Sequence, residues 1–293
     1  MRTPVAAPET KVVDQEVGFP RAHPEPITTI AFDDGETRTG ERAVAVEKAV
    51  NVIYGGVPFA VMMMTPADLE DFGAGFSLTE GVIESAADIR AIQVAEEPDG
   101  LKLLIDLVPG RLHEHLARRR AMSGRTGCGV CGIEDLASIP RARASDGAAP
   151  TVALAAIRRA LGELDERQEL NQVTRAVHAA GWADREGRLV AVREDVGRHN
   201  ALDKLIGALL GAGIGPQDGF FVITSRCSFE MVEKAGAFGA RTLVAISAPT
   251  SLALERARRL DITLVGIARR DTMTVFHGRE RIVGTAKAEE PPG

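Results

Sequence analysis

The residues best suited to chemistry form a short glycine-rich motif, Gly127-Cys128-Gly129-Val130-Cys131-Gly132, which holds two of the three cysteines in the chain. A cysteine thiolate is a nucleophile and a metal ligand. Two cysteines separated by two residues occur in zinc sites and in redox-active dithiols. Five arginines against one glutamate lie between positions 111 and 125, and this positive charge would favour the thiolate.

Four kinds of site can contain this motif, and the surrounding sequence argues against two of them. A dinucleotide fingerprint needs an apolar strand before its glycines, and the preceding LARRRAMSGRT is not one. Structural zinc needs four ligands, and a second C-x-x-C pair is missing, although Cys227 and a distant histidine could complete the set. We therefore expect no metal site. A thioredoxin-like dithiol and a mobile loop that carries a nucleophilic thiolate both stay open.

A second polar cluster spans residues 193–204, where seven of twelve side chains are ionisable. It falls where a predicted strand ends and a predicted helix begins. His199 could act as a general base or bind a ligand near neutral pH, whereas Asp195 or Asn200 could cap the helix. Capping explains only one or two of these residues, so we expect ligand binding by Asp195, Arg198 and His199.

The first half of the chain has the pattern of short strands, a helix and a hairpin. Strand-like runs occur at residues 27–32, 42–47 and 57–63. Thr65, Pro66 and Asp68 predict a helix start with a capping-box-like pattern. Glycine is unfavourable inside a helix, so we expect Gly73 and Gly75 to allow close packing against another backbone. A hairpin signal follows at residues 98–100.

The second half alternates strands and helices. A helix is predicted from Thr151, then a hairpin of strands 176–183 and 189–192, and then a helix near Asn200. Further strands are predicted at 220–224, 243–247 and 263–268, with helices at 229–238 and 251–260. This order predicts a parallel or mixed sheet covered by helices.

Polar residues follow the last three of these strands. They are Ser225, Arg226, Ser247, Thr250, Ser251, Arg269 and Arg270. Ligands of open α/β sheets bind beyond the carboxyl ends of the strands, and hydroxyls, helix amides and arginines suit phosphate. The alternative is that these residues only cap helices. Cys227 lies in the same place, and we expect it to be a small residue at a helix start rather than a redox partner.

Composition narrows the class of protein. The chain has 293 residues and a formal net charge of −6, which argues against general nucleic-acid binding. Three cysteines cannot build a disulfide framework and suit a reducing compartment. The longest apolar run, 57–64, is far shorter than a membrane span, and the first residues lack the apolar region of a secretory signal. We expect a cytoplasmic globular protein.

Taken together, the motifs resemble the FdhD family, the accessory sulfurtransferases of molybdenum or tungsten formate dehydrogenases. The resemblance covers about residues 25–283. It rests, in chain order, on Glu25-Pro26, Thr65-Pro66, GAGFSLTEGVI (73–83), GCGVCG (127–132), REDVGRHNALDK (193–204), SRCSFEMVEKA (225–235) and SAPTSLA (247–253). Departures occur before His178 and at residues 271–277, and they concern details of the cofactor contacts.

The resemblance implies an α/β protein with a cytidine-deaminase-like α/β/α core and a smaller N-terminal α+β part, usually a homodimer. We expect a flexible leader at 1–24, the N-terminal part at 25–118, the core at 119–286 and a tail at 287–293. The deaminase zinc signature combines H-x-E with P-C-x-x-C. Because Gly127 rather than proline precedes the first cysteine, we expect neither catalytic zinc nor deamination.

The resemblance also implies a function. A cysteine desulfurase would give a sulfur atom to Cys128 as a persulfide, with Cys131 as a possible partner. The sulfur would then pass to bis-molybdopterin guanine dinucleotide, a cofactor bound as substrate and needed by formate dehydrogenase. The family's cofactor-binding segment corresponds to Ile267, Ala268, Arg269, Arg270, Asp271 and Thr272. One alternative is a chaperone that delivers the cofactor without sulfur chemistry, and another is a zinc-stabilised adaptor.

Overall fold

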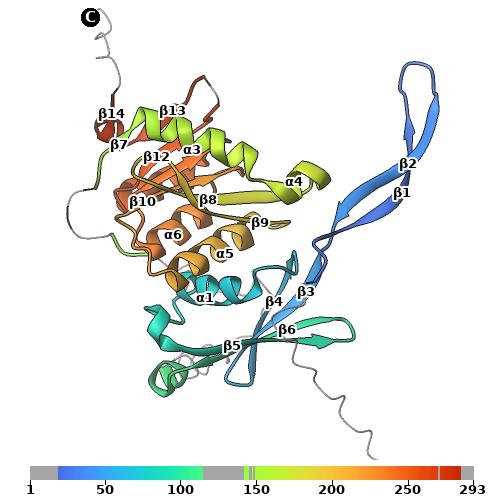
Figure 1. Ribbon diagram of the computed structural model, residues 1–293. Helices are drawn as coiled ribbons and strands as arrows, with labels where there is room; N and C mark the ends of the chain where they lie inside the picture. The colour runs from blue at the N-terminus through green and yellow to red at the C-terminus, as the bar shows by residue number, and fades with distance from the viewer. Residues whose placement is uncertain (1–18, 115–141, 145–146, 148, 270, 285–293) are drawn as a thin grey trace, which may run out of the picture.

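The computed structural model describes residues 19–114, 142–144, 147, 149–269 and 271–284. The chain begins with a two-stranded hairpin, β1 (Ala22–Ile30) and β2 (Thr37–Ala45), which projects from the body as an arm (Figure 1). Near the arm's base, Arg21 lies 3.4 Å from Glu169, but most arm side chains are exposed. Phe32 at the tip is fully exposed.

A four-stranded sheet follows the arm, with the order β4-β3-β6-β5. Its strands are β3 (Lys48–Tyr54), β4 (Val57–Met64), β5 (Ile89–Glu97) and β6 (Gly100–Leu107). Helix α1 (Leu69–Thr79) packs Phe72 and Phe76 against this sheet, because helical spacing places both rings on one face. The predicted β5–β6 hairpin is confirmed.

The larger sheet has six strands in the order β13-β12-β11-β10-β8-β9. They are β8 (His178–Asp184), β9 (Leu189–Asp195), β10 (Gly219–Ile223), β11 (Thr242–Ala245), β12 (Thr263–Gly266) and β13 (Thr274–His277). Strands β10, β11 and β12 are parallel, and β9 runs the same way because β8 is antiparallel to both β9 and β10. The last residues of these four strands therefore meet along one side of the sheet, which we call the carboxyl edge.

Helices cover both faces of this sheet (Figure 1). On one face lies α3 (Leu154–Glu166), and on the other lie α5 (Arg198–Gly211), α6 (Phe229–Phe238) and α7 (Ser251–Arg259). Short α4 (Glu169–Thr174) follows α3, and β7 (Val152–Ala153) pairs with β14 (Ile282–Val283). The prediction of an α/β protein with a helix–sheet–helix core is thus confirmed. The likeness to cytidine deaminases and the domain boundaries stay predictions.

Helix α1 joins the two sheets by packing on α5. A Cβ atom on Gly75 would lie 1.8 Å from the Asp203 carbonyl oxygen, and one on Gly207 would lie 1.8 Å from the Asp71 carbonyl oxygen. Side chains at either position would force the two backbones apart. The expected close approach to another backbone is therefore confirmed at Gly75, but at Gly73 the nearest atoms are side chains of β5 and β6.

Several elements differ from the sequence-based expectation. The helix expected to start at Thr65 starts at Leu69, after Asp68 in the left-handed region with φ 51°. Strand β1 begins at Ala22, inside the stretch expected to be a leader, and α3 begins at Leu154 rather than near Thr151. Strands β3 and β13 and helix α4 were not predicted. In the described part of the chain, no helix is long and apolar enough to cross a membrane.

Candidate functional site

The segments that follow three parallel strands meet at the carboxyl edge, as the sequence predicted. The backbone N–H of Cys227 donates to the Ala248 carbonyl oxygen at 3.2 Å, and the Thr250 N–H donates to the Cys227 carbonyl oxygen at 3.0 Å. The Ile267 N–H donates to the Ser247 carbonyl oxygen at 3.1 Å. These bonds hold the segments that follow β10, β11 and β12 side by side.

The expected binding residues at these joints differ in accessibility. Arg226, Thr250, Ser251, Arg269, Asp271 and Thr272 are exposed, Ser247 is half-buried, and Ser225 and Ala268 are buried. The Thr250 hydroxyl caps α7 by accepting from the Ala253 N–H, so capping and ligand binding would share one oxygen. Arg270 lies outside the described residues. The edge thus offers hydroxyls and the exposed guanidinium groups of Arg226 and Arg269, a set suited to phosphate.

Ile267 has an unusual backbone at the end of β12. Its φ is 52°, a left-handed value that is strained for a β-branched residue. The segment is held there by the Ser247 contact and by Arg269, whose Nη1 donates to the Ile246 carbonyl oxygen at 2.9 Å. This conformation leaves the Ile267 side chain 41% exposed at the carboxyl edge.

The charged cluster at residues 193–204 serves mainly to join the two sheets. Asp195 is fully buried, and its Oδ2 accepts from Lys204 Nζ at 2.6 Å and from the Thr65 N–H at 3.0 Å. Its Oδ1 accepts from the Gly197 N–H at 2.7 Å and from Asn200 Nδ2 at 3.0 Å. Asp195 therefore cannot contact a ligand directly in this conformation. It can influence ligand binding only by fixing the turn between β9 and α5.

Other members of the cluster have structural partners too. The Arg193 guanidinium binds Asp71 at 2.6 Å. The Glu194 carboxylate accepts from the Leu170 and Asn171 N–H groups at the start of α4. Most of the cluster is therefore occupied within the protein, and only Arg198 and His199 keep polar atoms for a ligand.

Arg198 and His199 open α5 at the carboxyl edge. Among the described residues, Arg198 Nε and His199 Nε2 are buried atoms without a hydrogen-bond partner. Burial lowers the pKa of His199 to about 4, and Arg198 and Lys234 add to the effect. The imidazole is therefore neutral at physiological pH and can accept or donate a hydrogen bond.

A histidine of β8 lies in the same region. His178 pairs with Asp195 in the β8–β9 register. Burial lowers its pKa, with a further contribution from Arg198. The carboxyl edge thus carries two neutral imidazoles beside an arginine.

A buried polar network that sequence reasoning missed lies behind this edge, between α1, α5 and α6. Lys234 Nζ contacts Asp203 Oδ2 at 2.8 Å and the Thr79 hydroxyl at 3.0 Å. Burial alone would lower the pKa of Lys234, but the Asp203 carboxylate raises it. One signal was available, because Asp203 and Lys204 interrupt an otherwise apolar helix pattern.

The cysteines divide into two groups. Cys128 and Cys131 lie outside the described residues. Cys227 is free and fully buried directly before α6, and burial raises its pKa to about 12. Its thiol is therefore neutral and inaccessible, as expected for a packing residue. Within the described ranges no group of three or more histidine, cysteine or acidic side chains is placed to hold a metal ion.

The fold and the site define the chain as an α/β protein whose carboxyl edge is polar and carries arginines. Its sequence matches the model of the FdhD/NarQ family over residues 45–283. The chain belongs to this family, and the resemblance seen in the motifs is confirmed.

Two relatives and one solved structure show the extent of the similarity. A sulfur carrier protein FdhD from Xanthomonas axonopodis pv. citri is 47% identical over 256 residues, which cover 87% of this chain and 91% of the relative. The protein of the same name from Agrobacterium fabrum is 45% identical over 273 residues, or 93% and 99% of the two chains. The crystal structure of a protein described as a formate dehydrogenase accessory protein from Desulfotalea psychrophila matches with a TM-score of 0.70 and 27% identity. It covers 90% of this chain and 100% of that one.

Proposed function

We propose that this protein is a sulfur carrier that receives sulfur from a cysteine desulfurase and transfers it to bis-molybdopterin guanine dinucleotide for formate dehydrogenase. The observation that carries the proposal is the GCGVCG motif in a chain that is 47% identical to a sulfur carrier protein. A soluble cytoplasmic homodimer is part of the same proposal.

The resemblance to the FdhD family favours Cys128 as the carrier in this proposal. Its thiolate attacks the outer sulfur of the desulfurase persulfide, so one S–S bond forms as another breaks, and the desulfurase cysteine leaves as a thiolate. In the second step the Cys128 thiolate is the leaving group and the sulfur bonds to the metal of the substrate. That metal, in its reduced form, supplies the two electrons that convert the sulfur to sulfide. Cys131 would exchange sulfur with Cys128 within the motif.

The carboxyl edge is the proposed site for the guanine dinucleotide. Arg226 and Arg269 would bind phosphate oxygens, helped by the hydroxyl groups of Ser247, Thr250 and Ser251. Neutral His199 and the Arg198 Nε would offer further hydrogen bonds. The segment 267–272 remains part of this proposed site, with Ile267 supplying an apolar contact. The buried Asp195 would hold the turn that carries Arg198.

Mass spectrometry tests the sulfur step. Incubation with a cysteine desulfurase and cysteine should add about 32 Da per sulfur atom to the Cys128 peptide. Cys128→Ala should abolish this addition and the activation of formate dehydrogenase. Cys227→Ala is the matched control and should load like the wild type, because the buried thiol takes no part. Full loading and full activation in both the Cys128→Ala and Cys131→Ala variants would refute the sulfur-carrier proposal in favour of delivery without sulfur chemistry.

Calorimetry with GDP tests the nucleotide site. Arg269→Ala should weaken GDP binding roughly tenfold to a hundredfold, since a charge-assisted bond to phosphate contributes about 1.5–3 kcal/mol. Arg259→Ala is the control, because Arg259 pairs with Glu255 on the surface of α7. Equal affinities for the two variants would exclude Arg269 from the site.

A further inference from the structure

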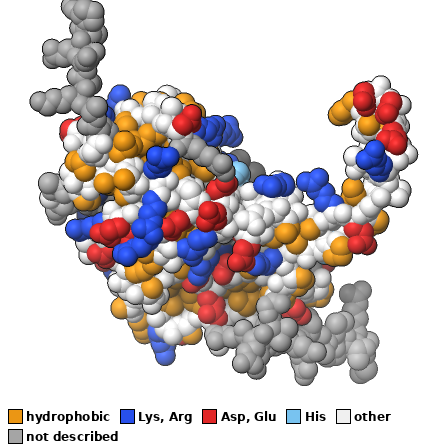
Figure 2. Space-filling model, turned by 45° about the horizontal axis from the view of Figure 1, so that its top comes forward, with side chains coloured by type: hydrophobic (Ala, Val, Ile, Leu, Met, Phe, Trp, Pro, Cys, Tyr) orange, Lys and Arg blue, Asp and Glu red, His pale blue; other side chains and the backbone are white. Residues whose placement is uncertain are grey.

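The tip of the β1–β2 arm presents an apolar side chain with acidic neighbours. Phe32 is fully exposed there. The six residues that follow it contain three acidic side chains and one arginine, namely Asp33, Asp34, Glu36 and Arg38, so the tip has a net charge of −2. The acidic side chains gather at the end of the arm (Figure 2). Arg38 already pairs with Glu36 at 2.9 Å, which leaves the two aspartates to face a partner.

Beyond its base, the arm has no cover from the part of the chain that the structure describes. It leaves the body beside α4, whereas α6 lies across the body from it (Figure 1). Nine residues in each strand give the arm a length of about 30 Å, which is about the diameter of a small domain. A lone hairpin is only marginally stable in water. The arm is therefore long enough to reach across a neighbouring molecule and would be stabilised by doing so.

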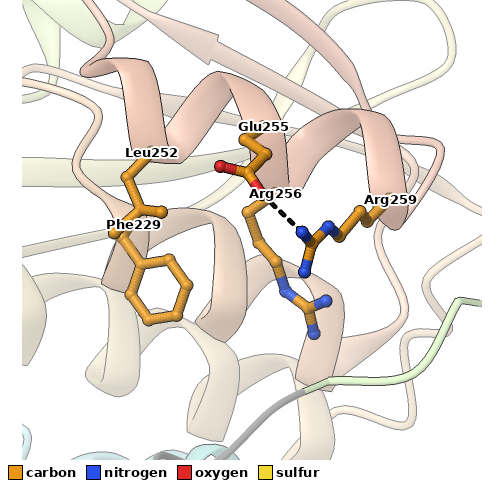
Figure 3. Close-up of a pocket in the computed structure, with 5 residues that line it drawn as sticks. All are labelled: Phe229, Leu252, Glu255, Arg256 and Arg259. Carbon is orange, nitrogen blue, oxygen red and sulfur yellow. Dashed lines mark hydrogen bonds and ion pairs between the residues drawn. The ribbon is translucent and has the colours of Figure 1, made fainter. Parts of the chain in front are cut away.

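The body has a hollow that can receive an aromatic ring, between α6 and α7. Its volume is about 240 Å³. Figure 3 shows Phe229 and Leu252 together at one end of it, with the arginines Arg256 and Arg259 at the other. Leu252 is 52% exposed, so the apolar end is open to solvent. A cavity of about 150 Å³ accommodates benzene, and the hollow is therefore large enough for a phenyl ring.

The charge of α7 is opposite to that of the arm's tip. Residues 251–259 contain three arginines and one glutamate, a net charge of +2. Arg256 is already held in a largely buried ion pair. Arg258 and Arg259 are exposed, and Arg259 pairs with exposed Glu255 at the surface. Aspartates that approach from outside can join this surface pair. Such complementary charges favour encounter and fix the register of two surfaces.

We propose that the arm of one copy docks its tip in the α6–α7 hollow of a second copy of this chain. Phe32 then lies against Phe229 and Leu252, where aromatic rings gain more than their buried area alone. The two aspartates of the tip face Arg258 and Arg259. A second copy fits because one chain carries both complementary surfaces, and a two-fold axis forms both contacts at once. The inference rests on the homodimer of the proposed function and needs no sulfur chemistry.

Sedimentation equilibrium over a range of protein concentrations tests the docking. Phe32→Ser should raise the dissociation constant of the dimer about thirtyfold, the loss typical of an interface anchor. Leu252→Asp should do the same, because its carboxylate meets the acidic tip. Its exposed position in the first turn of α7 tolerates an acidic side chain. Val190→Ser is the control. This side chain is 47% exposed on β9, at the other end of the six-stranded sheet.

The outcomes separate this inference from the proposed function. A dimer whose dissociation constant is the same in Phe32→Ser, Leu252→Asp and the wild type would overturn the docking and leave the homodimer in place. A wild type that stays monomeric would overturn the docking and the homodimer together. In either case, persulfide loading of Cys128 still decides on the sulfur-carrier step.

Disulfide cross-linking locates the tip on the partner. Two proteins are mixed, one with Asp33→Cys and the other with Glu255→Cys, which keeps Phe32 and the apolar end of the hollow intact. Both carry Cys128→Ala and Cys131→Ala, and buried Cys227 does not react. The mixture should form a disulfide between the two engineered positions, identified by peptide mass. Glu186→Cys is the matched control for Glu255→Cys, because these side chains are 65% and 55% exposed. Equal cross-linking of Asp33→Cys to both positions would refute docking in the hollow.

Discussion

Individual charged residues of the 193–204 cluster have different uses that their residue types do not reveal. Asp195 and Lys204 are fully buried and neutralise each other, while Arg198 and His199 keep unpartnered atoms at the carboxyl edge. Aspartate, histidine and arginine can each form structural hydrogen bonds and ion pairs or bind a ligand. The sequence therefore predicted where the cluster lies. Only the contacts in the structure distinguish the residues that join the two sheets from those that belong to the candidate binding site.

The depressed pKa of His199 predicts a pH effect on stability. Its folded-state pKa is about 4, whereas an unfolded histidine titrates near 6.5. As the pH falls from about 6.5 to 4, the unfolded chain binds the proton more readily, so His199 lowers native stability across this window. Charged and titratable groups facing it are Arg198, Lys234, Glu230 and His178.

The His199→Gln variant should therefore lose less stability than the wild type between pH 7.5 and pH 5. Urea unfolding at the two pH values measures this, with the exposed His113→Gln as the control. An equal fall of the unfolding midpoint in all three proteins would contradict a neutral, partly buried His199.

At the scale of elements, periodicity predicted the second half of the chain better than the first. Helix α6 has the predicted bounds, 229–238, because helical spacing and a clear joint define it. Strand β3 was missed because polar Asn51 lies within it and because the arm ends immediately before it. The α1 start was wrong because Thr65 serves the other sheet, and its hydroxyl accepts from the Val196 N–H. Contacts between residues that are far apart in the sequence produce no pattern in the sequence around either residue.

Two glycine-to-alanine substitutions should have opposite effects on the free energy of unfolding, because only one of the new Cβ atoms would clash with a neighbouring backbone. Gly75→Ala should destabilise the protein by about 2 kcal/mol or more, because its Cβ would meet the Asp203 backbone. Gly162→Ala is the control at an exposed position of α3, where nothing lies within 4 Å of the new Cβ. That change should stabilise by about 0.5–1 kcal/mol. Chemical denaturation measures both, and a neutral Gly75→Ala would exclude close backbone packing.

The whole molecule combines a dense body with a thin arm. In the described body a six-stranded and a four-stranded sheet are joined where α1 packs on α5, whereas β1 and β2 pair only with each other. Figure 2 shows acidic side chains gathered at the arm's tip, which includes Asp33, Asp34 and Glu36. A two-stranded hairpin is marginally stable in water.

The rates of amide hydrogen exchange should therefore differ sharply between the arm and the six-stranded sheet. Amides of β1 and β2 should exchange within seconds to minutes at neutral pH, whereas those of β10, β11 and β12 should exchange only on sub-global or global unfolding. Mass spectrometry of peptides 22–45 and 219–266 checks this at two protein concentrations. Arm protection at low concentration would contradict an unsupported hairpin, and protection that grows with concentration would identify a second copy as its cover.

The contacts of Thr65 also determine how long the N-terminal half must wait for its packing partner while the chain is being synthesised. Lys204, which donates to the Thr65 carbonyl oxygen, is 139 residues downstream. At about 5–20 residues per second, a ribosome needs roughly 7–28 s to bridge that interval. During this time the face of α1 that packs against α5 has no partner, and the nascent N-terminal half exposes it to solvent. Chaperone demand should thus be highest midway through translation, and slow codons between the two segments should lower the yield of folded protein.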